Sequence, residues 1–91
     1  MKQKRERLEL IHDILKAIQN HRGEMKPTHI MYKANLSPKM LNTYLDYLVK
    51  KGFIIFSESE KGKTYRILDK GHNYIVKYGM ISSFIDSFGL D

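Results

Sequence analysis

The first apolar pattern along the chain is that of an amphipathic helix. Apolar side chains recur three or four positions apart, at Leu8, Ile11, Ile14, Leu15 and Ile18. This spacing places them on one side of an α-helix, with polar and charged residues on the other side. Gly23 follows the stripe and can take the left-handed backbone conformation that ends helices. We therefore expect a first helix that buries this stripe.

Two further helices are predicted from their N-terminal signals. Thr28, directly after Pro27, is the expected N-cap of a short second helix whose apolar face is Ile30, Met31 and Ala34. Asn35 accepts a positive φ, so a tight turn is expected there. Ser37 is the expected N-cap of the third helix, and Pro38 suits its first position because its missing N–H does no harm there.

The third helix, expected over residues 38–51, has two chemically different sides. At 100° per residue, the apolar side holds Leu41, Tyr44, Leu45 and Leu48. The polar side and its shoulders hold Lys39, Met40, Asn42, Thr43, Asp46, Tyr47 and Lys50. Asp46 and Lys50 are four residues apart, so we expect them to form an ion pair.

The remaining third of the chain predicts a β-hairpin and a last helix. "FIIF" and "TYRIL" are strand-like runs separated by "SESEKGK", which indicates a hairpin with a longer loop and with Lys61 and Lys63 at its tip. Asp69 is the expected N-cap of the last helix. Its apolar positions are spaced 4, 3, 4 and 3, as in a coiled-coil seam: Tyr74, Tyr78, Ile81, Ile85 and Phe88. We expect this seam to be a homodimer interface.

The charge of the chain favours a polyanionic partner. Its 91 residues contain 16 Lys and Arg against 10 Asp and Glu, a net charge of +6. Such an excess of positive charge is typical of nucleic-acid binding, although many small proteins are basic without it. The length suits one domain, and a domain this small buries only about 60–65% of its unfolded surface, which makes a partner subunit plausible.

Several classes of function lack their sequence signals. There are no cysteines, and the four histidines are scattered without the spacing of metal ligands, so we expect no metal and no cofactor. No nucleophile elbow or P-loop is present, and we expect no enzyme. No apolar run reaches the roughly 18 residues of a membrane span, and no signal-type apolar block follows the basic N-terminus, so we expect a cytoplasmic protein.

The order of elements is helix, helix, tight turn, helix, hairpin, helix, which matches a helix-turn-helix followed by a wing. Three segments, "RLELIHDILKAI", "THIMYKANLSPKMLNTYLDYLVKKGFI" and "YRILDKGHNYI", resemble the family of small archaeal winged helix-turn-helix domains. The departures are Asp69, where that family usually has Thr, and a last helix shorter than the long coiled coil of some relatives.

The resemblance implies an α+β, mainly α fold: three helices, a β-hairpin wing and an added C-terminal helix. It also implies dimeric DNA-binding proteins, either transcription regulators or chromatin-type proteins, whose last helix pairs across the dimer. We accordingly expect a DNA-binding domain over residues 1–68, and a dimerisation helix over residues 69–91 packed on the same domain. The expected function is sequence-specific or semi-specific binding of double-stranded DNA by a transcription regulator.

The DNA-facing residues that the resemblance implies lie near the start of the third helix: Ser37, Lys39, Met40, Asn42 and Thr43. Side-chain chemistry selects nearly the same set, because Asn pairs with adenine, Lys with guanine or phosphate, and Thr with either base edge or a thymine methyl. The expected phosphate contacts are Tyr32, Lys33, Lys61, Lys63, Lys4 and Arg5.

A protein–protein interaction module without DNA binding is the alternative function, since one fold serves several functions. Such a module would be expected to have apolar or acidic character on the outer side of the third helix and an uncharged wing. Here that side is polar and mostly basic, and the wing carries "KGK", although Glu58 and Glu60 partly neutralise it. RNA is a lesser alternative, because no aromatic stacking platform is evident.

Overall fold

The fold, seen here in a computed structural model, is described for residues 2–90, with side chains from residue 6 onward. The first helix, α1 (Lys2–Asn20), contributes one side of its C-terminal half to the core. Its stripe is buried as the sequence predicts at Ile11, Ile14, Leu15 and Ile18, whereas Leu8 is partly exposed. The chain turns after α1 with Arg22 and Gly23 both at positive φ, which confirms the expected role of the glycine.

The helix-turn-helix follows a short strand. Helix α2 (Pro27–Lys33) and helix α3 (Pro38–Lys50) are joined by a turn in which Asn35 has φ 56°, as predicted. The Oγ of Ser37 accepts from the N–H of Met40 at 3.2 Å, so Ser37 is the N-cap of α3. The predicted cap of α2 is wrong. Lys26 is the N-cap and Pro27 the first helical residue, because proline already has the helical φ and needs no donor there.

A three-stranded antiparallel sheet forms the wing and its base. Strands β2 (Ile54–Ser59) and β3 (Gly62–Ile67) pair from Ile54–Ile67 to Ser59–Gly62, and the two-residue strand β1 (Glu24–Met25) pairs with the other edge of β3. The predicted longer loop is wrong, since only Glu60 and Lys61 separate the paired strands. Lys61 lies at the tip, and Lys63 lies within β3 opposite Glu58. The sequence analysis missed β1.

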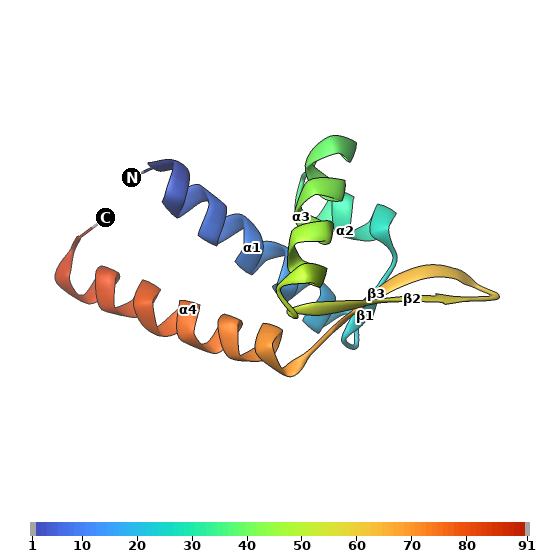
Figure 1. Ribbon diagram of the computed structural model, residues 1–91. Coiled ribbons are helices and arrows are strands. Elements are labelled where there is room, and N and C mark those ends of the chain that lie inside the picture. The colour runs from blue at the N-terminus through green and yellow to red at the C-terminus, as the bar shows by residue number, and fades with distance from the viewer. Residues whose placement is uncertain (1, 91) are drawn as a thin grey trace.

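The last helix, α4 (Asp69–Phe88), packs on α1 at its beginning and leaves the core at its end. Figure 1 shows α1 and α4 extending to the side of the molecule where both termini lie, with the wing on the opposite side. The predicted cap is wrong, because Leu68 is the N-cap and Asp69 lies in the first turn. A carboxylate in that turn still favours the helix through the partial positive charge at its N-terminal end.

These elements confirm the predicted fold class, mainly helical with a small sheet. The core lies between α1, α2, α3 and the base of the wing, where Leu45, Leu48 and Ile54 are among the most deeply buried side chains. No helix in residues 2–90 is long and apolar enough to cross a membrane.

Candidate nucleic-acid interface

Helix α3 separates its apolar and polar residues onto two sides. Leu41, Leu45 and Leu48 are buried in the core and fix the helix along its length. The DNA-facing residues expected from the sequence are all exposed: Ser37, Lys39, Met40, Asn42 and Thr43. They cover the N-terminal half of α3 and form one continuous outward surface, which we call the α3 outer surface.

Local hydrogen bonds limit what two of these side chains can offer a partner. The Ser37 Oγ already accepts from a backbone N–H within α3. The Thr43 Oγ1 donates to the carbonyl of Lys39 at 3.0 Å, so its proton is occupied while its methyl group remains exposed. Lys39 and Asn42 have no side-chain hydrogen bond or ion pair within the described part of the chain. These two retain their full capacity to bind a ligand.

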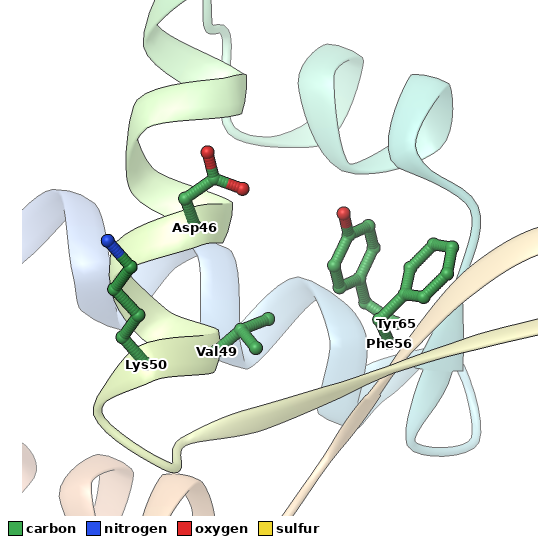
Figure 2. Close-up of a pocket in the computed structure, with 5 residues that line it drawn as sticks. All are labelled: Asp46, Val49, Lys50, Phe56 and Tyr65. Carbon is green, nitrogen blue, oxygen red and sulfur yellow. The ribbon is translucent and has the colours of Figure 1, made fainter.

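The ion pair expected between Asp46 and Lys50 is not formed. The salt bridge recorded among the described side chains joins His12 and Asp13, and Figure 2 shows the side chains of Asp46 and Lys50 pointing in different directions. An exposed pair of this kind gains only a few tenths of a kcal/mol, which does not fix two long side chains in one geometry. Asp46 therefore presents an unpaired carboxylate on the outer side of α3.

A pocket of about 340 Å³ separates α3 from the wing. Asp46, Val49 and Lys50 line it from α3, and Phe56 and Tyr65 line it from the wing (Figure 2). The rings of Phe56 and Tyr65 are 5.4 Å apart. Burial, together with the negative charge of Asp46, raises the pKa of the Tyr65 phenol above its usual value of 10.0. The phenol therefore stays protonated at neutral pH and remains a hydrogen-bond donor.

The expected phosphate-contacting residues come from three separate elements. Tyr32 and Lys33 are exposed on α2, and Tyr32 is 76% exposed. Lys61 and Lys63 are exposed on the wing. The side chains of Lys4 and Arg5 lie outside the described residues. The structure thus places α2 and α3 next to each other, whereas the hairpin of β2 and β3 extends away from them (Figure 1).

The sequence analysis did not predict a cationic cluster beside α3, formed by Arg7 and Lys51 on the ring of Tyr47. The guanidinium of Arg7 lies 4.8 Å from the ring centre of Tyr47, and the ammonium of Lys51 lies 5.8 Å from the same centre. Arg7 and Tyr47 are 40 positions apart in the chain, so no local pattern could have joined them. A tyrosine with a cation on its ring forms a positively charged surface beside the α3 outer surface.

The expected dimer seam on α4 divides into two parts. Tyr74 donates its hydroxyl proton to the carbonyl of Leu8 at 2.5 Å, and the ring of Tyr78 stacks on that of His12 at 4.4 Å. Both tyrosines thus contact α1 of the same chain. Further along, Ile85 is half-buried, while Ile81 and Phe88 are exposed. A second apolar row with steps of four residues is exposed on α4: Val76, Met80, Phe84 and Phe88.

No group of three or more His, Asp or Glu side chains suited to a metal ion occurs among the described residues. His21 and His29 approach each other with ring centres 6.1 Å apart, but no carboxylate completes a site around them.

The chain belongs to a winged helix-turn-helix family, whose sequence model matches residues 4–85. A curated relative, the uncharacterized protein MJ0290 of the archaeon Methanocaldococcus jannaschii, is 45% identical over 51 residues, or 56% of this chain. That alignment covers 23% of MJ0290, so the chain spans about a quarter of the length of this relative. The family predicted from the sequence is thereby confirmed.

Solved structures confirm the fold. Sso10a-2, a DNA-binding protein from Sulfolobus solfataricus, is similar with a TM-score of 0.78 and 23% identity, over 89% of this chain and 82% of that one. TubR from Bacillus thuringiensis serovar israelensis, solved with 24 bp of tubC, has a TM-score of 0.67 and 17% identity, over 79% and 81% of the two chains.

Proposed function

We propose that the protein binds double-stranded DNA as a homodimer and acts as a transcription regulator. Helix α3 enters the major groove and the wing contacts the backbone. The observation that carries the proposal is the α3 outer surface, a set of exposed side chains able to contact bases and phosphates, held on the core by three buried leucines. In helix-turn-helix proteins the second helix of the pair presents its N-terminal residues to base edges.

Three side chains of α3 contact bases in this proposal. Asn42 pairs bidentately with adenine through its amide, and Lys39 contacts guanine or a nearby phosphate. Thr43 presents its methyl group to the methyl of thymine, because its hydroxyl proton is already bonded to the Lys39 carbonyl. Ser37 and Met40 lie at the edge of the same surface.

The backbone contacts come from the elements around α3. Tyr32 and Lys33 of α2, Lys61 and Lys63 of the wing, and the basic residues Lys4 and Arg5 approach phosphates on either side of the groove. The net charge of +6 supports this arrangement. So do the printed descriptions of two proteins that share the fold, since Sso10a-2 is a DNA-binding protein and TubR was solved with DNA.

The homodimer rests on the exposed apolar half of α4. Ile81 and Phe88 of the expected seam, and Met80 and Phe84 of the neighbouring row, are each more than half exposed. A contiguous apolar surface of this kind marks an interaction site. Two subunits joined there present their α3 helices to successive major grooves, roughly 34 Å apart on one face of B-DNA.

The test is a fluorescence-anisotropy titration of labelled random duplex DNA at two salt concentrations. If each subunit neutralises about four phosphates, the slope of log affinity against log salt is near −7 for the dimer. The triple variant Lys39→Ala/Asn42→Ala/Thr43→Ala should lose this binding. A matched variant with a Lys, an Asn and a Ser replaced at exposed positions of α1 and α4, Lys16→Ala/Asn73→Ala/Ser83→Ala, should keep it.

Absence of binding by the wild type even at low salt would contradict the proposal. The protein–protein interaction module would then be the better account of the same fold, with α4 as its binding surface. Binding that the triple variant retains would place the DNA on another face of the molecule.

A further inference from the structure

Asp46 is the one acidic side chain on the outer side of α3. It lies one helical turn beyond Asn42 and Thr43, and it is exposed. It forms no ion pair with Lys50, and no hydrogen bond is recorded for its carboxylate within the described part of the chain. A carboxylate on a DNA-facing surface repels phosphate, so its presence there needs a physical reason.

We propose that Asp46 is a base-reading residue that accepts a hydrogen bond from the exocyclic amino group of cytosine in the major groove. This inference rests on the proposed function, DNA binding through α3, and adds a specificity determinant to it. Carboxylates are hydrogen-bond acceptors only, and cytosine N4 is the donor that they are suited to contact in that groove.

The position of Asp46 on the helix suits this role. Four residues of α-helix make about one turn and advance about 6 Å along the helix axis, so Asp46 lies on the same side of α3 as Asn42. With α3 in the groove, Asp46 therefore faces a base pair beyond the one that Asn42 contacts. Asp46 lines the open pocket between α3 and the wing together with Val49, Phe56 and Tyr65 (Figure 2). The Tyr65 phenol is close enough for the negative charge of Asp46 to raise its pKa, but no hydrogen bond joins the two side chains, and the exposed carboxylate remains accessible to a base.

The same charge also explains how one residue can discriminate between sequences. Where the carboxylate faces the acceptor edge of guanine or thymine, it weakens binding through repulsion. On a site with cytosine at the matching position it gains a charge-assisted hydrogen bond. Specificity is a difference between affinities, and a repulsive group that only the correct site relieves increases that difference.

The experiment selects bound sequences from a randomised duplex library with four proteins: wild type, Asp46→Ala, Asp46→Asn and the control Asp86→Ala. Asp86 is an exposed acid on α4 whose side chain has no recorded partner among the described residues. Affinities for random duplex and for the selected sites are then measured by anisotropy. All four proteins should give the same helical circular dichroism, because both acids are exposed.

The wild type and Asp86→Ala should select cytosine at one position, with a preference of about fivefold or more over other bases. Asp46→Ala should lose that preference alone and bind random duplex about threefold more tightly, because a repulsive charge has gone. Asp46→Asn should change the preference from cytosine to adenine, since an amide both donates and accepts.

Two results would overturn the inference. One is an unchanged base preference in Asp46→Ala, which would make Asp46 a repulsive surface charge and nothing more. The other is binding of random duplex by the wild type without any cytosine preference, which would leave the proposed DNA binding intact and remove the role of Asp46. Failure of the wild type to bind any duplex would instead refute the proposed function, and the inference with it.

Discussion

Gly71 occupies a position in the first turn of α4 where only a hydrogen atom fits. A Cβ built there would lie 2.6 Å from Cγ1 of Ile67 and 2.8 Å from the carbonyl oxygen of Phe53. Such contacts are too short for a side-chain carbon, and the carbonyl belongs to the backbone and cannot move alone. The glycine in "DKGHNY" thus has a packing reason, which is the close approach of α4 to the start of the wing.

Alanine substitutions at two glycines of α4 should therefore have opposite effects. Gly71→Ala should lower the free energy of unfolding by about 1–3 kcal/mol, as overpacking does. Gly79→Ala should raise it by about 1 kcal/mol, because nothing lies within 4 Å of that Cβ and alanine favours the helix. Urea denaturation of both variants beside the wild type measures the difference. Equal effects of the two changes would contradict this account of Gly71.

Tyr74 makes the stability of the α1–α4 contact depend on pH in the alkaline range. Burial, then the neighbouring phenols of Tyr78 and Tyr47, raises its pKa from 10.0 to about 12. Only the protonated phenol can donate to the carbonyl of Leu8. Between pH 10 and 12 the unfolded chain loses this proton while the folded protein keeps it, so stability falls as pH rises through that window.

The variant Tyr74→Phe removes both the hydrogen bond and the titrating group. At pH 8 it should be less stable than the wild type by roughly 1 kcal/mol, the usual net value of one hydrogen bond. Its stability should decline less between pH 10 and 12, so the two unfolding curves converge at high pH. Denaturant melts at pH 8, 10 and 11.5 test this, and parallel decline of both proteins would show that Tyr74 does not titrate as described.

In the proposed complex the wing contacts phosphates, whereas α3 contacts bases. Lys61 at its tip and Lys63 on β3 are exposed, and the opposite strand carries Glu58. A lysine that contacts phosphate carries no sequence information. Lys61→Ala/Lys63→Ala should therefore weaken binding to all duplexes by the same factor and make the log–log salt slope shallower by about 2 per subunit.

The control for the wing is Lys16→Ala/Lys77→Ala, which removes the same charge from exposed positions of α1 and α4. It should change affinity and slope less than the wing variant. Anisotropy titrations on a selected site and on random duplex, each at four salt concentrations, provide both quantities. A change in base preference in the wing variant would contradict a backbone role.

Most elements could be predicted because local chemistry determines them. The stripe of α1, the Ser37–Pro38 start of α3 and the positive φ of Asn35 each depend on residues within a few positions. The wrong predictions concern contacts between residues distant in sequence, or a choice between two adjacent residues for the N-cap position. Strand β1 has two residues and exists only because β3 offers a free edge, and Lys26 takes the capping position once Pro27 enters the helix.

In the candidate site, too, the features set by local sequence could be predicted, and those that depend on distant residues could not. The exposed set on α3 was predictable from helical periodicity, since burial of three leucines fixes which side faces outward. The absence of an ion pair between Asp46 and Lys50 could not be predicted, because a four-residue spacing permits such a pair without requiring it. The pocket beside Asp46 and the Arg7–Tyr47 contact depend on how the wing and α1 pack against α3, which no single segment specifies.

The dimer proposed for this molecule depends on surface that the single chain leaves uncovered. Tyr74 and Tyr78 contact α1 of the same chain, so the first half of the predicted seam packs within one subunit. The second half exposes apolar side chains of which Phe84 and Phe88 are the largest, with ring centres 4.9 Å apart. Association through these rings would bury them without disturbing the core.

Phe84→Glu/Phe88→Glu should accordingly give a folded monomer. Sedimentation equilibrium should show a dimer for the wild type and a monomer for this variant, with the same helical circular dichroism. The log–log salt slope on DNA should fall to about half, from near −7 to between −3 and −4, because one subunit contacts half the phosphates. Ser82→Glu/Ser83→Glu adds equal charge on another side of α4 and should remain dimeric. If the phenylalanine variant also remained dimeric, the subunits would have to join elsewhere, with the partly exposed Leu8 end of α1 as the next surface to test.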